Sequence, residues 1–124
     1  MENINIDATD DSPKVTLDYA KGFIEFEGEC YPENTFEFFE PILAWIKAYF
    51  DGNTQDETTV NFKLTYFNSA TTQALFDLFD ELEEAECDSL NVNWFYDENN
   101  KNTLTDYEEF SEEFESLNIQ AIKK

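Results

Sequence analysis

The chain of 124 residues contains no arginine and no histidine, and its seven cations are all lysines. Without histidine it lacks the commonest general base near neutral pH and the commonest metal ligand. Without arginine it lacks the guanidinium that binds a phosphate through two parallel hydrogen bonds. The 29 acidic residues leave a net charge of -22, which argues against nucleic acid or an anionic membrane as a partner.

Cysteine and long apolar runs are also scarce. The two cysteines, Cys30 and Cys87, are far apart and form no C-x-x-C pair. The sequence shows no apolar leader and no run of about 18 apolar residues that would span a bilayer. We therefore expect a cytoplasmic protein with reduced, structural thiols, with one long-range disulfide as the alternative.

Aromatic residues, in contrast, are abundant. Hydrophobic residues make up 41% of the chain and aromatic residues 17%, including 13 phenylalanines. A chain of this length and composition can bury one core despite its charge. We expect a single domain over residues 1–124, in which residues 1–12 form either a loose arm or an edge strand.

Strand-like and helical patterns alternate along the chain. Residues 15–18 and 23–27 flank Gly22 and predict a β-hairpin. Further strands are expected over 60–67, 90–96 and 119–122, separated by single helices. This order favours parallel neighbours with helical crossovers. The sequence thus predicts an α/β fold, a mixed sheet with an N-terminal hairpin, covered by about three helices.

The expected helices have recognisable starts. Asn34, followed by Glu37, forms a capping-box pattern, and Thr105 with Glu108 forms a second one for the last helix. The middle helix is expected over about 70–85. The spacing in the first helix predicts a buried stripe made of Phe36, Phe39, Leu43, Ile46 and Phe50.

Three aromatic side chains lie off the predicted stripes. They either pack beneath loops or form an apolar docking patch rimmed by acidic residues, which is the usual anatomy of a protein interface. These residues are Phe38, Trp45 and Phe76.

Acidic clusters raise the alternative of a metal- or carboxylate-dependent enzyme. Residues 97–108 approach a calcium-loop spacing, but Lys101 occupies a ligand position and Asn102 replaces the glycine. The acidic residues of 80–84 fit a solvated helix face. A serine nucleophile would need a lysine base, and no S-x-x-K motif occurs. We therefore predict no catalytic residues, no metal and no cofactor.

Hydroxyl groups gather where the strand over 60–67 meets the following helix, in the sequence Asn68-Ser69-Ala70-Thr71-Thr72. A helix N-terminus favours negative charge, because its first N–H groups are free and its dipole is positive there. Ser69 is therefore either an ordinary N-cap, a role that Asn68 fills equally well, or a phosphorylation site.

Three segments resemble one family. Tyr31-Pro32-Glu33-Asn34, Tyr66-Phe67-Asn68-Ser69 and Trp94-Phe95-Tyr96-Asp97 are similar, in order and spacing, to the SiaC-type regulatory phosphoproteins of bacteria. The resemblance extends from about residue 13 to residue 117. It implies a fold like the STAS domains of anti-sigma-factor antagonists, and an adaptor switched by phosphorylation at the hydroxyl after the asparagine.

Carried to this chain, the resemblance makes Ser69 the phosphoacceptor, with Thr71 and Thr72 as fallbacks. The family more often has threonine there, followed by serines. The implied partners are a kinase resembling histidine-kinase ATPase domains, a metal-dependent serine/threonine phosphatase and a diguanylate cyclase. The alternative from the residues alone is a constitutive acidic interaction module in which Ser69 is only a cap.

Overall fold

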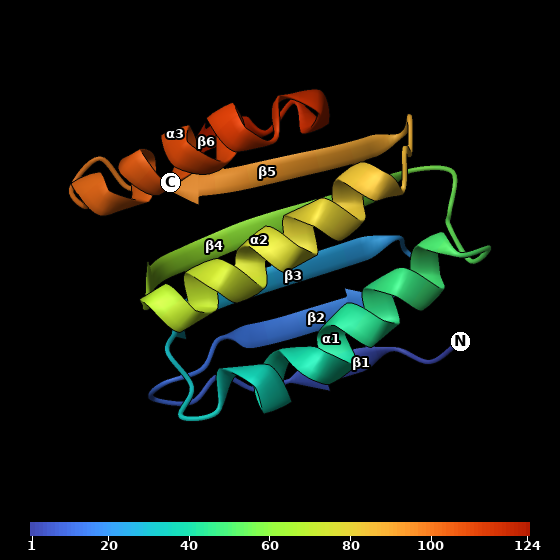
Figure 1. The fold of residues 1–124 in the computed structure, drawn as a ribbon, viewed down its shortest axis with the longest axis horizontal. Coiled ribbons are helices and arrows are strands. Elements are labelled where there is room, and N and C mark those ends of the chain that lie inside the picture. The colour runs from blue at the N-terminus through green and yellow to red at the C-terminus, as the bar shows by residue number, and fades with distance from the viewer.

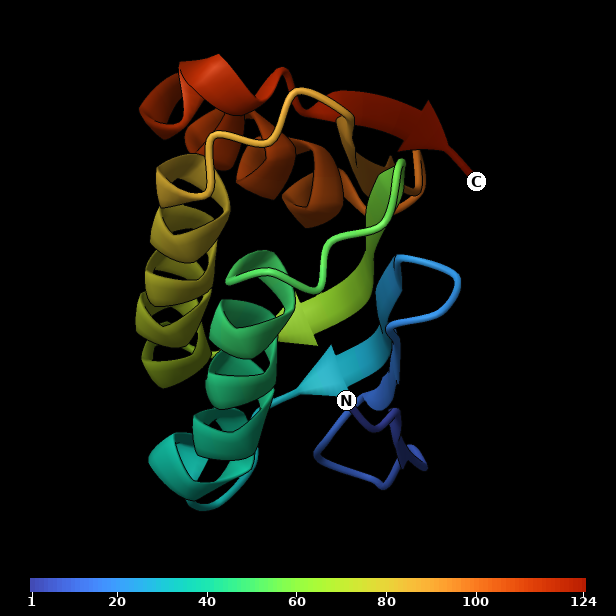
Figure 2. The same ribbon diagram turned by 90° about the vertical axis from the view of Figure 1, so that its right-hand side faces the viewer.

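A six-stranded mixed sheet carries three helices on one of its faces (Figure 1 and Figure 2). The computed structural model describes all residues, 1–124. The strands are β1 (Ile4–Ile6), β2 (Lys14–Asp18), β3 (Phe23–Cys30), β4 (Thr58–Phe67), β5 (Leu90–Tyr96) and β6 (Gln120–Lys123). The helices are α1 (Thr35–Phe50), α2 (Ser69–Glu84), α3 (Lys101–Glu113) and a short 3-10 turn, Glu115–Leu117.

The strands lie in the sheet in the order of the sequence, β1 to β6. The pairs β1–β2 and β2–β3 are antiparallel, whereas β3–β4, β4–β5 and β5–β6 are parallel. The predicted α/β fold, with its N-terminal hairpin, mixed sheet and three helices, is thus confirmed. Of the two alternatives for residues 1–12, Ile4–Ile6 forms the edge strand beside β2.

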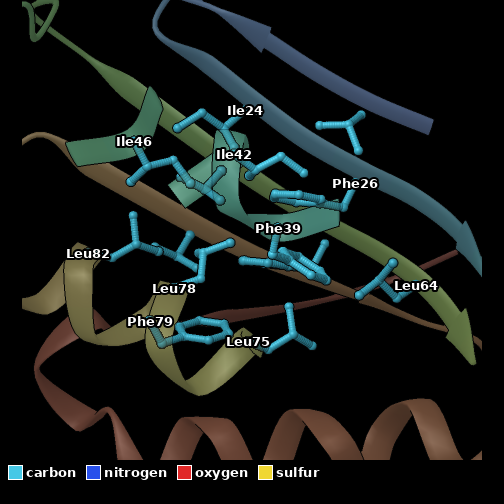
Figure 3. Packing of buried hydrophobic residues seen from close by; sticks show 14 of the residues in the cluster. Ile24, Phe26, Phe39, Ile42, Ile46, Leu64, Leu75, Leu78, Phe79 and Leu82 are labelled. Atoms are coloured by element: carbon cyan, nitrogen blue, oxygen red, sulfur yellow. The ribbon is translucent and has the colours of Figure 1, made fainter. Parts of the chain in front are cut away.

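The core lies between the sheet and the helices (Figure 3). Alternate residues of each strand point to this side, which is why strands such as β4 bury Val60, Phe62 and Leu64 completely or nearly so. Phe62 is central: its ring stacks on Phe26 at 5.5 Å and on Trp94 at 5.4 Å between centroids. Stacked aromatic pairs add about 0.5–1.5 kcal/mol each beyond the area they bury.

The other face of the sheet is uncovered by helices (Figure 2). It carries a ladder of polar side chains across β3, β4 and β5. Asn61 Nδ2 donates to Glu25 Oε2 at 3.0 Å, and Asn93 Nδ2 donates to Asn61 Oδ1 at 2.9 Å. Lys63 Nζ lies 3.3 Å from Glu25 Oε2 and 4.9 Å from the centre of the Phe95 ring. Side chains thus join the three parallel strands on this face, in addition to the backbone hydrogen bonds.

The turn between β2 and β3 requires glycine. Gly22 has a φ of 60°, and a Cβ at this position would collide with the Glu57 carbonyl oxygen. Asp18 Oδ1 accepts a hydrogen bond from Lys21 N at 3.1 Å within the same turn. The hairpin predicted around Gly22 is therefore confirmed.

Helix α1 begins where the sequence predicts but faces the core differently. Asn34 Oδ1 accepts the Glu37 N–H at 3.1 Å, so the predicted cap is present. The predicted stripe is wrong at Phe36, which is 73% exposed. The buried residues are Phe39, Ile42, Trp45, Ile46 and Tyr49. Apolar residues occur almost all round this helix, so packing on the sheet, not spacing alone, selects the buried face.

Helix α3 begins at Lys101, four residues before the predicted cap at Thr105. The reason is Thr103, which is 2% exposed and whose hydroxyl donates to Asn100 O at 2.6 Å. The Thr103 carbonyl accepts the Trp94 Nε1–H at 3.1 Å and holds the first turn on the core. Thr105 lies inside the helix, and its hydroxyl donates to Lys101 O.

Two further features concern the cysteines and the helices. Cys30 and Cys87 are both unpaired, and Cys30 is buried. None of the three helices combines the length and the apolar character that crossing a bilayer requires.

Candidate functional site

The hydroxyl cluster lies at the edge of the sheet where the parallel strands end. Strand β4 ends at Phe67, Asn68 forms the N-cap, and Ser69 is the first residue of α2. In the register of the sheet, Cys30 at the end of β3 is level with Phe67. This edge, at the carboxyl ends of parallel strands, is where open α/β sheets generally place their functional groups.

The start of α2 is capped but carries no acidic side chain. Asn68 is extended, with φ -90° and ψ 178°, and its Oδ1 accepts the Thr71 N–H at 2.9 Å. The first turn of the helix has no aspartate or glutamate. The remaining free N–H groups and the positive end of the dipole are therefore not balanced by a local carboxylate.

The three hydroxyls in this segment have different surroundings. Thr71 is completely buried, and its Oγ1 donates to the Cys30 carbonyl at 2.9 Å. Thr72 is half-buried, and its Oγ1 donates to the Asn68 carbonyl at 3.1 Å. Ser69 is exposed. A phosphate-donating enzyme can reach Ser69 in the folded chain, whereas Thr71 would first have to leave the core.

Cys30 lies directly beneath this helix start. Its Sγ is 3.7 Å from Thr71 Oγ1. Burial, with a smaller contribution from the charge of Asp11, raises the pKa of the Cys30 thiol to about 11, although the hydrogen bond from Thr71 acts in the opposite direction. At neutral pH the thiol is therefore protonated and unreactive, in keeping with a structural role.

Two exposed tyrosines flank the site. Tyr31 is 36% and Tyr66 is 52% exposed, and their rings meet edge to face with centroids 5.7 Å apart. The Tyr31 hydroxyl donates to the Asp10 carbonyl at 2.9 Å. Partial desolvation, followed by the nearby carboxylate of Glu29, raises the pKa of Tyr31. Both tyrosines come from segments that the family resemblance singled out.

The three aromatic residues expected off the helix stripes do not form one patch. Trp45 is 6% exposed, and its Nε1 donates to the Glu2 carbonyl at 2.7 Å, so it belongs to the core. Phe38 is half-buried against Phe39. Phe76 is half-buried, with its ring 5.0 Å from that of Phe110. Of the two alternatives for Trp45, burial excludes an exposed docking patch, because α1 turns this flank toward the segment that precedes β1.

A groove that the sequence did not indicate runs between the first halves of α1 and α2, which lie side by side (Figure 1). It has a volume of about 410 Å³ and begins beside Ser69. Its lining is mainly apolar or uncharged, with one acidic residue from each helix: Thr35, Phe36, Phe39, Glu40, Leu43, Ala70, Gln73, Ala74 and Asp77. The small residues at 70 and 74 are the only sequence signal that would have pointed to it.

The acidic clusters are not arranged as a metal site. No group of three or more histidine, cysteine, aspartate or glutamate side chains is arranged to hold a metal ion. Asp97 Oδ1 accepts the Asn99 N–H at 2.8 Å within a turn, and Lys101 begins α3. On α3, burial and then the charge of Glu109 raise the pKa of Asp106 to about 6.

The geometry is thus that of an open α/β domain with a capped, exposed hydroxyl at the carboxyl edge of its sheet. A family model described as SiaC family regulatory phosphoprotein matches residues 6–124. An uncharacterized protein of Pseudomonas aeruginosa (strain UCBPP-PA14) is 30% identical over 116 residues, which cover 91% of this chain and 90% of that protein. The chain belongs to the SiaC family of regulatory phosphoproteins.

Solved structures agree with this assignment. The crystal structure of apo-SiaC from Pseudomonas aeruginosa is 26% identical, with a TM-score of 0.78 over 100% of this chain and 99% of that chain. A chain in the crystal structure of the diguanylate cyclase SiaD in complex with its activator SiaC, from the same organism, is 27% identical. Its TM-score is 0.89, over 98% of this chain and 99% of that chain.

Proposed function

We propose that this protein is a non-catalytic adaptor whose binding to an output protein is controlled by reversible phosphorylation of Ser69. The observation that carries the proposal is the contrast among the three hydroxyls. Ser69 is exposed, whereas Thr71 is buried and bonded to Cys30 O. Membership in a family of regulatory phosphoproteins supports a phosphorylated residue in this chain.

For the phosphorylation reaction, this chain needs to contribute only an accessible hydroxyl group. Ser69 Oγ attacks the γ-phosphorus of ATP held by the kinase, a base of the kinase takes the hydroxyl proton, and ADP leaves. The kinase is of the class that resembles histidine-kinase ATPase domains, and a metal-dependent serine/threonine phosphatase hydrolyses the ester. The chain has no histidine that could serve as this base.

The phosphate is expected to change binding more than folding. It adds about -1.5 to -2 charge at a helix start that tolerates anions. No arginine is present in the chain to capture it. Its effect therefore falls on the docked partner, through bulk and repulsion. A diguanylate cyclase is the proposed output protein, because a related chain was solved in complex with one as its activator.

The test is phosphorylation of the purified chain by its cognate kinase with ATP, followed by intact mass and peptide mapping. We expect one phosphate, on Ser69, and none on the Ser69→Ala protein. Thr35→Ala is the matched control, because Thr35 also follows a capping asparagine at a helix start. A phosphate on Thr71 or Thr72, or normal modification of Ser69→Ala, would show that the site is wrong.

A second measurement tests the switch. Unmodified protein and Ser69→Ala are expected to raise the activity of the cognate diguanylate cyclase, and phosphorylated protein is not. If Ser69→Asp and the phosphorylated protein bind the cyclase as tightly as the unmodified chain, the protein is a constitutive module and Ser69 is only part of a helix start.

A further inference from the structure

The groove between α1 and α2 has two chemically different halves. The half beside Ser69 has an apolar floor formed by Phe39, Leu43 and Ala74. Leu43 and Asp77 also line a second hollow, of about 320 Å³, which continues toward the ends of both helices. Its other lining residues are Lys47, Asp80, Glu81 and Glu84. We call the two hollows together the α1/α2 groove, with an apolar half and an acidic half.

The acidic half has more negative charge than the chain itself neutralises. Lys47 Nζ lies 3.4 Å from Glu81 Oε1, which accounts for the one cation in the lining. Asp77, Asp80 and Glu84 have no lysine partner. Carboxylates near the C-terminal end of a helix also oppose its dipole, and the last turn of α2 contains no basic residue. Glu84, in the last turn, therefore weakens α2, whereas Asp77 and Asp80 lie before that turn and also lack a cationic neighbour. A cationic ligand would balance all three carboxylates.

We propose that the α1/α2 groove binds an amphipathic helix of the partner protein, with apolar residues beside Ser69 and lysines or arginines over the acidic half. Both walls of the groove are helices, so it offers no free strand edge to which a partner could add a β-strand. Binding of a helix in the groove is the recognition mode that fits this geometry. From Phe36 to Lys47 the groove covers 12 residues of α1, a rise of about 16 Å along the helix. That length suits about three turns of a bound helix.

The exposed ring of Phe36 supports this occupant. It is 73% exposed at the mouth of the apolar half, and large aromatic side chains are typical anchors of protein interfaces. The inference deepens the proposed function and rests on it for the identity of the partner. Ala70, the residue after Ser69, lines the apolar half. A phosphate on Ser69 would therefore stand at the apolar end of the bound helix, where no cation balances it.

The binding experiment uses synthetic helical peptides and the full chain labelled with ¹⁵N. One peptide has leucines at helical spacing in its first half and lysines in its second, and another has the same composition with the pattern scrambled. We expect the patterned peptide to bind about tenfold more tightly, with amide shifts confined to α1 and α2. Equal affinities, or shifts on the uncovered sheet face, would overturn the proposal.

Matched variants distinguish binding in the groove from nonspecific attraction to the negative charge of the protein. Phe36→Ser and Ala74→Glu are expected to weaken the patterned peptide by about tenfold, and Leu104→Ser, at an exposed apolar position of α3, is not. Asp77→Asn with Asp80→Asn is expected to weaken it more than Glu112→Gln with Glu113→Gln on α3, which removes the same charge. Equal effects within either comparison would contradict the groove.

Orientation and independence from Ser69 complete the test. A spin label at the apolar end of the peptide is expected to broaden the amide signals of Phe36 and Ala70, and one at the basic end those of Asp80 and Glu84. The reverse pattern would overturn the proposed direction. Ser69→Ala is expected to bind the peptide normally, so the two proposals can fail separately. If Ser69 is not phosphorylated, the proposed function is refuted but peptide binding in the groove is unaffected. If the peptide does not bind, the groove is refuted but phosphorylation of Ser69 is unaffected.

Discussion

Helices α1 and α2 begin with the same chemistry but have different environments. Each starts with a capping asparagine followed by a hydroxyl residue, Asn34-Thr35 in α1 and Asn68-Ser69 in α2. The cap hydrogen bonds are nearly equal, 3.1 Å and 2.9 Å. Thr35 is half-buried, whereas Ser69 is exposed. A capped hydroxyl at a helix start is thus not sufficient to define the site.

The third residue of each helix explains much of the difference. In α1 it is Glu37, whose carboxylate already faces the positive end of the dipole. In α2 it is Thr71, whose hydroxyl donates to the Cys30 carbonyl in β3. The start of α1 is therefore balanced by a negative charge. The start of α2 is instead bonded to the sheet, and no carboxylate balances the positive end of its dipole. Four predictions test this contrast.

The largest effect on stability is expected when the hydrogen bond between Thr71 and the Cys30 carbonyl is removed. Thr71→Val keeps the shape of the side chain but leaves the buried Cys30 carbonyl without this donor, which costs about 1–3 kcal/mol of unfolding free energy. Thr35→Val, which removes a long hydrogen bond of 3.5 Å to Pro32, is expected to change stability by less than about 0.5 kcal/mol. Urea denaturation followed by circular dichroism measures both, and equal losses would refute the contrast.

The second prediction concerns the thiol beneath α2. The pKa of Cys30 is raised from 9.0 to about 11 by burial, so the folded state favours the protonated thiol. This contribution is complete below pH 9 and is lost as the pH rises toward 11, by about 1.4 kcal/mol at pH 10. The difference in unfolding free energy between wild type and Cys30→Ala is expected to shrink over that range. A constant difference would show that the thiol titrates normally.

The third prediction compares the caps. Asn68→Ala and Asn34→Ala are each expected to cost about 1 kcal/mol of unfolding free energy, and Asn68→Ser to restore most of the loss. Only Asn68→Ala is expected to slow phosphorylation of Ser69, because it alone disturbs the backbone next to the acceptor. If Asn34→Ala slows the kinase equally, the kinase recognises both helix starts.

The smallest effect is electrostatic. Ser69→Asp is expected to stabilise the chain by about 0.3–1 kcal/mol at low salt, because α2 has no acidic residue in its first turn. Thr35→Asp adds the same net charge, but close to Glu37, and is expected to give a smaller gain in stability. The difference between the two variants in urea denaturation should disappear at high salt. A larger gain at Thr35 would mean that the open end of the dipole lies on α1.

Much of the fold was predictable because local rules and packing agree. The alternation of residues 60–67, the glycine at position 22 and the asparagine cap of α1 each matched the structure. The buried face of α1 was not predictable, because apolar residues surround most of that helix. The start of α3 was missed because a tertiary contact, Trp94 to the Thr103 carbonyl, holds a first turn with no apolar pattern.

The candidate site was predictable only in part. The sequence placed three hydroxyls at a helix start, and the resemblance favoured Ser69, but the reason that Thr71 is unsuitable is its bond to a strand 41 residues away. The groove depends on two helices that are brought together by the parallel order of β3 and β4. Neither feature can be derived from a local pattern alone, because both depend on residues that are distant in the sequence.

The polar ladder on the uncovered face has a practical consequence. Glu25, Asn61 and Asn93 join β3, β4 and β5 on the side away from α2. Because this surface is braced by its own bonds, we expect it to look the same before and after modification. A nanobody raised against this surface would therefore bind the phosphorylated and unphosphorylated protein equally. Its signal would measure the total amount of the protein in a cell, against which the phosphorylated amount could be normalised.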